Sequence, residues 1–586
     1  MKKIKFLATL LAAGALVACN ETIEPQGSGE NTPTTGEGYV KVAINMPTTS
    51  GDMTKVDDSG IFDDGLESEY AVKSAALVFF KASSTLSATP ESEAIFVKAY
   101  DVTTSLAGEG GSDNQVTNRH IVLNEAPMAG DGEQIYALAI LNYTSLFTVT
   151  AGGALQMNNA DVFSNENNKL AALQTKVETS VNIVADNATK GKGFLMTNSP
   201  LATTSTQSEI TDLTKVRTLV PVTVYAEETT AENSEAASIY VERVVAKVTL
   251  KGFAYSATDG YTKDVKTENG DAFEGDKVKM EGWVLNVTNK STNIVRNVDD
   301  ITIWCNNTYG TDNRFLGTTK IDNKNLFRIY WGKDHNYDVA YINLDDASAQ
   351  FNIYNNESSD IPWNTNAEHD NSSSPLYCLE NTMKYDCQNE NQTTTLLLKT
   401  TYIADPNSDD QNFFMVGNRE ETYTVDSFKE LVKNTLSLGS DVVVNVTDPN
   451  GGVYIYNGQE TAGNNDIRKI LTGLTKEQAN SLYNALGAIK FYKEGASYYN
   501  TVLIRHFSDD TDVDWDASEP NYGTKHLGRY GVLRNNWYEI NVSSISGPGE
   551  PEIPDPGTDP NDNTEGYIRA EINVLSWAKR SQDVDL

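Results

Sequence analysis

Side chains that could perform catalysis are scattered through this chain of 586 residues without the spacing that an active site requires. The histidines form no HExxH sequence and no i, i+4 pair that would place two ligands on one helix face. They are His120, His335, His369, His506 and His526. No GxSxG sequence, which would present a nucleophilic serine on a tight turn, is found either. The sequence therefore predicts no enzyme, no metal centre and no cofactor.

Two stretches have the composition of a ligand-binding loop without its full pattern. Gly108–Gly111 lacks the strand–turn–helix context of a phosphate loop, and we interpret it as a hairpin turn. Asp510–Asp516 alternates carboxylates, as a Ca²⁺ loop does, but it misses the glycine and the final glutamate of an EF-hand. We interpret it as a solvated acidic loop. No spacing of carboxylates points to glycoside hydrolysis.

One cysteine stands where covalent modification is expected. Met1–Cys19 begins with three lysines, continues with the apolar run Phe6–Val17, and ends in small residues before Cys19. The apolar run is too short for a good membrane span. This order resembles a bacterial lipoprotein signal, in which the cysteine receives lipid and becomes the first residue. We expect residues 1–19 to be a signal peptide and Cys19 to anchor the exported precursor in the outer membrane. An ordinary cleaved signal with an incidental cysteine is the alternative.

Three further cysteines, Cys305, Cys378 and Cys387, allow at most one disulfide within the chain. Cys378 and Cys387 are close enough in sequence to close a hairpin-sized loop. Whether they pair depends on their Cα separation, and the sequence leaves this open.

Two segments at opposite ends of the chain share one side-chain pattern. Gly38–Asn45 reads GYVKVAIN, and Gly566–Asn573 reads GYIRAEIN. Both alternate as a half-buried strand does. The residues that we assign to these strands are Tyr39, Val40, Val42, Ile44 and Met46 in the first, and Tyr567, Ile568, Ala570, Ile572, Val574 and Trp577 in the second. Segments with one pattern can occupy one groove, so we interpret the first as a placeholder and the second as a donor strand for a neighbouring copy. A chance match is the alternative.

A protease site follows the first strand. Pro47 ends the strand, and the small polar residues after it predict an accessible loop that contains Lys55. A trypsin-like cut between Lys55 and Val56 would release the propeptide, residues 20–55, with the placeholder strand and together with the lipid on Cys19.

The body of the chain, residues 56–546, has the composition of a large secreted β protein. It is too long for one core, and the content of 28 Tyr with abundant Thr, Val and Asn favours strands. Expected strands are Ala75–Phe80, Ile135–Leu141, Leu219–Tyr225, Ile239–Leu250, Phe327–Trp331, Thr395–Thr401, Tyr498–Phe507 and Trp537–Ile545. We expect domains over 56–252 and 253–546. One face of the strand at 239–250 would hold both Glu242 and Leu250, so Glu242 needs a partner or an edge position.

Two helices are expected in the second domain. Ser427–Leu436 presents one apolar face and has Asp426 as its N-cap. Thr475–Leu486 has Thr475 and Gln478 spaced as a capping box, and Gly487 ends it. We expect both to pack against a sheet.

The donor strand lies in the last segment, residues 547–586, which begins with a proline-rich linker. Residues 547–565 contain five prolines, which oppose sheet pairing and favour an extended connector. At ~3.1 Å per residue it could span about 60 Å. We therefore expect the tail to leave its own domain and reach the next molecule.

The net charge of −35 argues against nucleic acid as a partner, because binding to phosphates requires a basic surface. It suits a soluble surface protein. A surface lipoprotein that binds glycan or a host protein without polymerising is the alternative function, and an extracellular hydrolase is a third.

Several motifs together resemble the fimbrillin family of Bacteroidetes, the subunits of type V pili, and within it the major (stalk) subunits of minor fimbriae. They are the signal through Cys19, Phe62–Leu66, Gly193–Asn198, Val241–Val248, Arg328–Trp331, Ile504–Phe507, Gly528–Tyr538, the proline-rich stretch, Trp577 and Val584–Leu586. Members are often cut after Arg, whereas the candidate here is Lys55.

The resemblance implies two transthyretin-like β-sandwich domains, export as a palmitoylated lipoprotein, surface proteolysis, and polymerisation by donor-strand exchange. The implied partners are copies of the chain itself, anchor and tip subunits, and a trypsin-like protease at the cell surface. Because the chain has both a removable strand and a tail, the resemblance implies a stalk subunit that supports adhesion and biofilm formation.

Overall fold

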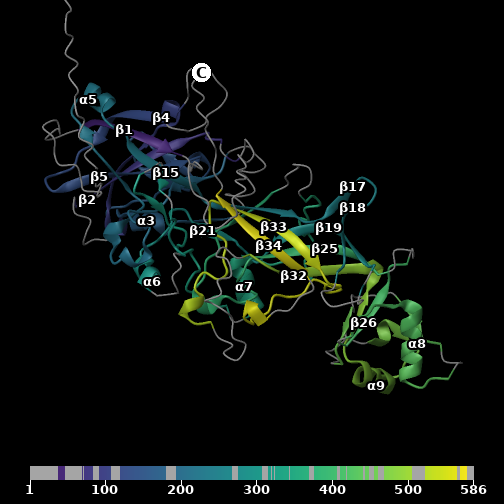
Figure 1. Ribbon diagram of the computed structural model, residues 1–586. Helices are drawn as coiled ribbons and strands as arrows, with labels where there is room; N and C mark the ends of the chain where they lie inside the picture. The colour runs from purple at the N-terminus through teal and green to yellow at the C-terminus, as the bar shows by residue number, and fades with distance from the viewer. Residues whose placement is uncertain are drawn as a thin grey trace, which may run out of the picture.

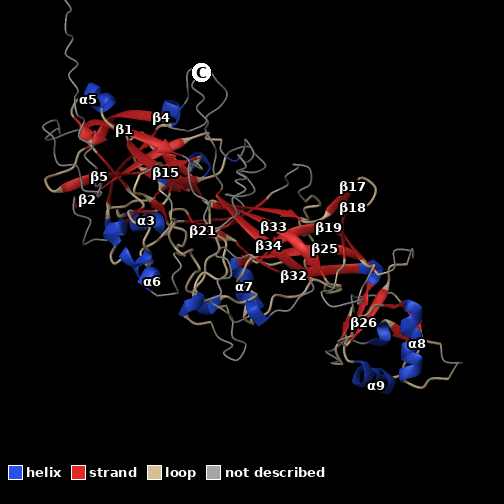
Figure 2. Cartoon of the chain, viewed as in Figure 1, coloured by secondary structure: helices blue, strands red, loops and turns tan. Residues whose placement is uncertain are grey.

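Short strands carry most of the regular structure in the computed structural model, and the helices between them are brief (Figure 2). The structure describes residues 37–45, 69, 71–83, 91–106, 119–179, 193–266, 273, 275–306, 314–318, 320–321, 324–341, 343–367, 375–404, 410–417, 419–439, 443–447, 454–458, 467–504, 522–563 and 568–576. The expectation of an all-β fold with short helices is confirmed.

The N-terminal domain is built on a nine-stranded sheet in the order β14-β1-β15-β10-β5-β2-β3, with β4 beside β1 and β13 beside β5 (Figure 1). Its strands are β1 (Glu37–Asn45), β2 (Ala75–Ser83), β3 (Ile95–Asp101), β4 (Arg119–Pro127), β5 (Glu133–Leu141), β10 (Met196–Asn198), β13 (Val220–Val222), β14 (Val224–Tyr225) and β15 (Ala237–Arg243).

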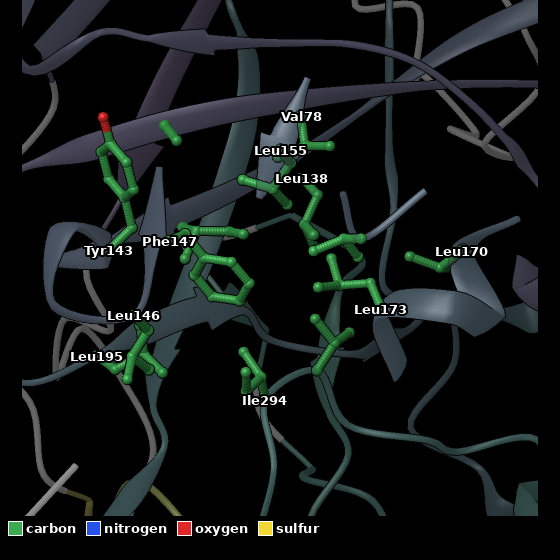
Figure 3. Close-up of a cluster of buried hydrophobic side chains, with 14 of the residues drawn as sticks. Val78, Leu138, Tyr143, Leu146, Phe147, Leu155, Leu170, Leu173, Leu195 and Ile294 are labelled. Carbon is green, nitrogen blue, oxygen red and sulfur yellow. The ribbon is translucent and has the colours of Figure 1, made fainter. Parts of the chain in front are cut away.

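Two cores flank strand β2, which explains its unbroken apolar run. Leu77 and Phe79 point to a core shared with β1 and β15. Val78 and Phe80 point the other way, into the cluster drawn in Figure 3, where Val78 lies near Leu138. A strand buried on both faces has no polar side to alternate with.

The C-terminal domain is a sandwich of two sheets, ordered β24-β16-β33-β34 and β17-β18-β19-β25-β32. Its strands are β16 (Val245–Lys251), β17 (Ala254–Ser256), β18 (Gly260–Asp264), β19 (Lys277–Asn286), β24 (Leu376–Leu379), β25 (Thr395–Ile403), β32 (Ala496–Leu503), β33 (Asn536–Ile545) and β34 (Ile568–Ser576). Apolar side chains of β16, β19, β25 and β33 meet between the sheets.

The chain passes from the sheet of β1 to the sheet of β33 at Val244, and the domain boundary expected near Gly252 stays a prediction. The strand expected at 239–250 is divided there: Ile239 and Val241 of β15 enter one core, while Val248 and Leu250 of β16 enter the other. The inward positions change from odd to even numbers at the junction. The alternating stretch at 239–250 therefore forms two strands in two different sheets. Glu242 and Leu250 lie in different strands and do not share a face.

A third, smaller module is inserted between β25 and β32, and the sequence patterns did not separate it from the second domain. Its four-stranded sheet runs β27-β26-β31-β29, and two helices, α8 and α9, cover it (Figure 1). The bounds are β26 (Phe413–Val416), β27 (Tyr423–Thr424), α8 (Val425–Thr435), β29 (Ile455–Tyr456), α9 (Lys476–Leu486) and β31 (Ile489–Tyr492). Both helices were expected, and the capping box of α9 is present. The N-cap of α8 is Thr424, not Asp426.

Short strand pairs and helices complete the described parts of the chain. The strands are β6 (Phe147–Val149), β7 (Leu155–Met157), β8 (Ala160–Asp161), β9 (Val177–Thr179), β11 (Leu201–Ala202), β12 (Val216–Arg217), β20 (Thr288–Asn289), β21 (Ser291–Asn293), β22 (Phe327–Arg328), β23 (Phe351–Asn352), β28 (Asn445–Val446) and β30 (Leu471–Thr472). The helices are α2 (Thr103–Leu106), α3 (Leu170–Gln174), α5 (Glu228–Asn233), α6 (Ile301–Asn306) and α7 (Leu344–Gln350).

Candidate assembly site

Strand β1 occupies an inner position in the N-terminal sheet and has partners on both sides. Along one edge it pairs antiparallel with β4, with a bulge between Gly38 and Val40. Along the other edge its first half pairs antiparallel with β14, where Tyr39 faces Tyr225, and its second half pairs parallel with β15, where Ile44 faces Ile239. Removal of β1 would therefore leave unpaired backbone on three strands.

The inward side chains of β1 fill a groove in the domain core. Val40, Val42 and Ile44 are completely buried, as their alternation predicted. They pack in one cluster with side chains of β2, β5 and β15, among them Phe79 and Ile239. The groove is thus an apolar trough that only a strand with apolar residues at alternate positions can fill.

On the opposite face of β1, Lys41 makes polar contacts with the end of α5. The Lys41 ammonium donates to the backbone oxygens of Glu232 and Ser234, at 2.7 and 3.1 Å. These carbonyls end α5, where a cation is favoured because the last carbonyls of a helix lack intrahelical donors. Ala43 is 5% exposed, so this position admits little bulk.

The C-terminal strand lies on its own domain, which differs from the expectation that the tail leaves it. β34 pairs antiparallel with β33 from Ile545–Ile568 to Asn536–Ser576. Among the described strands β33 is its only partner, so β34 is an edge strand. It covers backbone groups of β33 that would otherwise be open to pairing with other chains.

The proline-rich linker is also not free, and we call residues 546–563 the strap. Its backbone bridges β32 at Glu550 and Tyr498, with both N–H···O distances 2.8 Å. Ile553 is 7% exposed and packs with Val284 and Leu397. The prolines prevent continuous sheet pairing but not docking, because carbonyls, side chains and the remaining N–H groups make the contacts.

The structure describes part of the sequence-predicted site. Tyr39, Val40, Val42 and Ile44 lie together in β1. Ile568, Ala570, Ile572 and Val574 lie in β34, in the other domain. Cys19, Met46, Lys55, Val56, Tyr567 and Trp577 are outside the described residues, as are Gly108–Gly111 and Asp510–Asp516.

A buried group of charges at the domain junction was missed by the sequence analysis. Glu69 accepts a hydrogen bond from Tyr377 at 2.5 Å and pairs with Lys247 at 3.1 Å. Its backbone oxygen accepts from the Arg243 guanidinium at 2.8 Å. Burial lowers the pKa of Arg243 to about 10. Glu69 is therefore held by side chains of β15, β16 and β24.

A second buried network explains how Glu242 is accommodated. Its carboxylate lies 3.4 Å from Arg296, and Arg296 reaches Glu380 at 3.1 Å. Arg534 binds the other oxygen of Glu380 at 2.9 Å. Burial raises the pKa of Glu242, while the nearby guanidinium groups of Arg296 and Arg534 oppose that shift. The partner that the sequence required for Glu242 is Arg296, from the loop after β21.

The part of the chain that the structure describes holds no disulfide and no group of potential metal ligands. Cys305, Cys378 and Cys387 are free and buried, and burial raises the pKa of each thiol to about 12. The buried His526 accepts a hydrogen bond from the Gly523 N–H at 2.9 Å, as a packing residue does. Within the same ranges, no helix has the length and apolar character to cross a bilayer.

Three solved structures illustrate the likeness to known proteins. A candidate cell adhesion protein from Parabacteroides distasonis shares 12% identity at a TM-score of 0.37, over 94% of this chain and 100% of that one. A fimbrilin from Porphyromonas gingivalis shares 12% identity at a TM-score of 0.36, over 94% of this chain and 100% of that one. A tip fimbrial protein of the same species, truncated at its C-terminus, shares 10% identity at a TM-score of 0.29, over 92% of this chain and 100% of that one. The comparison with curated proteins finds no match.

A protein-family model matches residues 490–583, and its description is "Major fimbrial subunit protein type IV, Fimbrillin, C-terminal". The matched region begins in β31 and contains β32, β33, the strap and β34. It therefore includes β34, the strand that repeats the pattern of β1, and β33, with which β34 pairs. On this match, residues 490–583 are similar to the C-terminal region of the fimbrillins.

Proposed function

We propose that this chain is the stalk subunit of a surface fimbria of the minor-fimbria type. It is exported as a lipoprotein through Cys19, trimmed after Lys55 by a trypsin-like protease, and joined head-to-tail by donor-strand exchange. Anchor and tip subunits end the filament, which supports adhesion and biofilm formation. The family match supports the coarser part of this proposal, a role as a fimbrial subunit.

The position of β1 is the observation that carries the proposal. This strand is buried, pairs on both edges, and lies N-terminal to Lys55, so a cut there would free it from the rest of the chain. After a cut at Lys55, the rest of the domain remains one continuous chain. Loss of β1 from it would leave a preformed groove. β34 repeats its pattern and lies at a sheet edge, from which a strand can leave.

The tail sequence fits the groove when Gly566 is aligned with Gly38. Ile568 and Ile572 then take the places of Val40 and Ile44, and Arg569 takes the place of Lys41. A guanidinium at that position can donate to the same carbonyl oxygens at the end of α5. The least favourable substitution is Glu571 for Ala43, since it brings a carboxylate to a crowded position.

The energetics favour exchange only after trimming. Each large apolar side chain returned to the groove contributes ~1.5–3 kcal/mol, and each backbone hydrogen bond ~0.5–1.5 kcal/mol. These terms oppose an association cost of ~4–15 kcal/mol. Before the cut, β1 has a high effective concentration because it belongs to the same chain. Donor and groove lie on different domains, so the contact is head-to-tail and builds a filament.

Unheated gel electrophoresis after mild trypsin tests this function. The trimmed full chain should give a ladder, and a version truncated before Gly566 should give a monomer. The Lys55→Ala variant, as matched control, should keep residues 20–55 and stay monomeric. Monomers in every lane would contradict the proposal and favour a non-polymerising lipoprotein that binds glycan or a host protein.

A further inference from the structure

The end of the strap is held more firmly than its role as a flexible spacer would require. The Arg529 guanidinium makes a two-pronged contact with the Asp562 carboxylate, at 2.8 Å from Nε and 2.5 Å from Nη2. The Tyr522 hydroxyl donates to Oδ2 of the same carboxylate at 2.9 Å. The side chains of Arg529 and Asp562 are 11% and 7% exposed. A largely buried bidentate pair of this kind fixes both position and orientation.

The preceding residue is fixed as well. Asn561 is 1% exposed, and its amide donates to the backbone oxygen of Gln388 at 2.9 Å and to the Thr393 hydroxyl at 2.6 Å. Its backbone N–H also reaches Gln388. Upstream, Glu550 pairs with Lys490 at 2.6 Å. The strap is thus attached at several points, and among the described residues before β34 the last of these attachments is at Asp562, six residues before β34 begins.

We propose that the Asp562–Arg529 pair is the fixed point from which the donor tail leaves, and that the strap stays docked when the tail enters the next copy of this chain. The inference rests on the proposed function, and it adds where the two copies meet. In this exchange, β34 leaves β33 while the strap keeps its contacts. The anchored strap makes that meeting place constant from one subunit to the next.

The length of chain after Asp562 limits how far the acceptor's groove can lie from the donor's clamp. The five residues from Asp562 to Tyr567 span at most about 18 Å at ~3.3–3.6 Å each, against roughly 60 Å for the whole linker as a free connector. In the aligned register, Tyr567 takes the place of Tyr39, which faces Tyr225 at the start of the groove. The acceptor's groove must therefore begin within about 18 Å of the donor's Asp562. Contacts between the two subunits would form around this point.

The charges near both ends are complementary. Lys525 is exposed beside the Asp562 clamp, on the turn that contains His526. Glu227 and Glu228 are exposed at the start of α5, next to β14. In the proposed arrangement, the donor's Lys525 approaches the acceptor's glutamates. Opposite charges at the rim of a contact guide orientation and register more than they add affinity.

Electron microscopy of trimmed filaments tests the clamp. Asp562→Asn keeps the shape of the side chain and removes its charge; Asp555→Asn, which loses only an exposed contact to Asn355, is the matched control on the same strap. Wild type and Asp555→Asn should give straight filaments with one sharp axial repeat. Asp562→Asn should still give a ladder, but its filaments should bend more and show a broadened repeat. An unchanged repeat and stiffness in Asp562→Asn would overturn the inference.

If Asp562→Asn fails to fold or to polymerise, hydrogen exchange on the wild-type protein tests whether the strap stays docked. The amides of Glu550, Asn561 and Asp562 should keep the same protection in monomer and filament, because the strap stays docked. Loss of that protection in the filament would overturn the inference. Absence of any ladder from the trimmed wild type would instead contradict the proposed function, so the two failures are distinct.

Discussion

The Lys247 ammonium lies 3.1 Å from the Glu69 carboxylate, and the two side chains are 1% and 0% exposed. Lys247 is in β16 of the C-terminal domain, whereas Glu69 belongs to the segment that follows the expected cleavage site. The ammonium also lies 4.0 Å from the centroid of the Trp537 ring in β33. One buried ion pair therefore ties Glu69 to the sheet on which β34 lies.

Glu69→Ala should lower the free energy of unfolding by about 3–5 kcal/mol, because it leaves the Lys247 charge buried without its partner. Denaturant unfolding followed by tryptophan fluorescence measures the loss. The double variant Glu69→Leu with Lys247→Met is the control: it removes both charges and keeps the volume, so it should recover most of the stability. If the single and double variants are equally unstable, the cause is packing and not the unpaired charge.

Ile44→Ala should destabilise the untrimmed chain by about 2–5 kcal/mol, since Ile44 is completely buried in the groove. Lys41→Gln, on the other face of the same strand, should cost ~1 kcal/mol or less. In trimmed filaments the effect of Ile44→Ala should vanish, and Ile572→Ala should weaken the filament instead. The temperature at which filaments of each variant dissociate measures whether filament stability depends on Ile572 and no longer on Ile44. A lasting effect of Ile44→Ala after trimming would mean that β1 stays in place.

The stability of the C-terminal domain should depend on pH through Asp334. Burial raises the pKa of this carboxyl from 3.8 to about 8, so the folded state binds a proton more tightly than the unfolded state. The resulting stabilisation is complete below pH 3.8 and is lost as the pH rises toward 8, by up to about 1.4 kcal/mol per pH unit. Asp334→Asn cannot titrate, so unfolding measured from pH 4 to 8 should show a shallower decline. An equal slope in both proteins would place the titration elsewhere.

The three cysteines other than Cys19 should be titratable as free thiols. Cys378 and Cys387 are separate and buried, and the raised pKa of each thiol opposes thiolate formation. A thiol reagent should react slowly with the folded chain and with three groups after denaturation without reductant. Reaction with only one group would reveal a disulfide between two of them.

Local patterns predicted the elements well where one physical rule dominated. The alternation of β1 identified Val40, Val42 and Ile44 as one face of the strand, and the capping box identified the start of α9. The split of the strand at 239–250 was not predictable, because the inward face changes at Val244 without a glycine, a proline or a polar turn. The docked strap was missed for a related reason: prolines exclude sheet pairing, but they do not exclude attachment through carbonyls and side chains such as Ile553. The buried Glu69 lies in a polar stretch, and its partners are distant in sequence.

The central claim is that the C-terminal strand of one copy takes the place of β1 in the next. Native mass spectrometry tests it directly: the folded chain, truncated before Gly566, is trimmed at Lys55 and mixed with a synthetic peptide of residues 566–586. The account predicts that the peptide binds one-for-one as the fragment of residues 20–55 is lost, and that untrimmed protein loses nothing. Peptide bound with the fragment still in place would instead report pairing with β33 and would contradict the exchange.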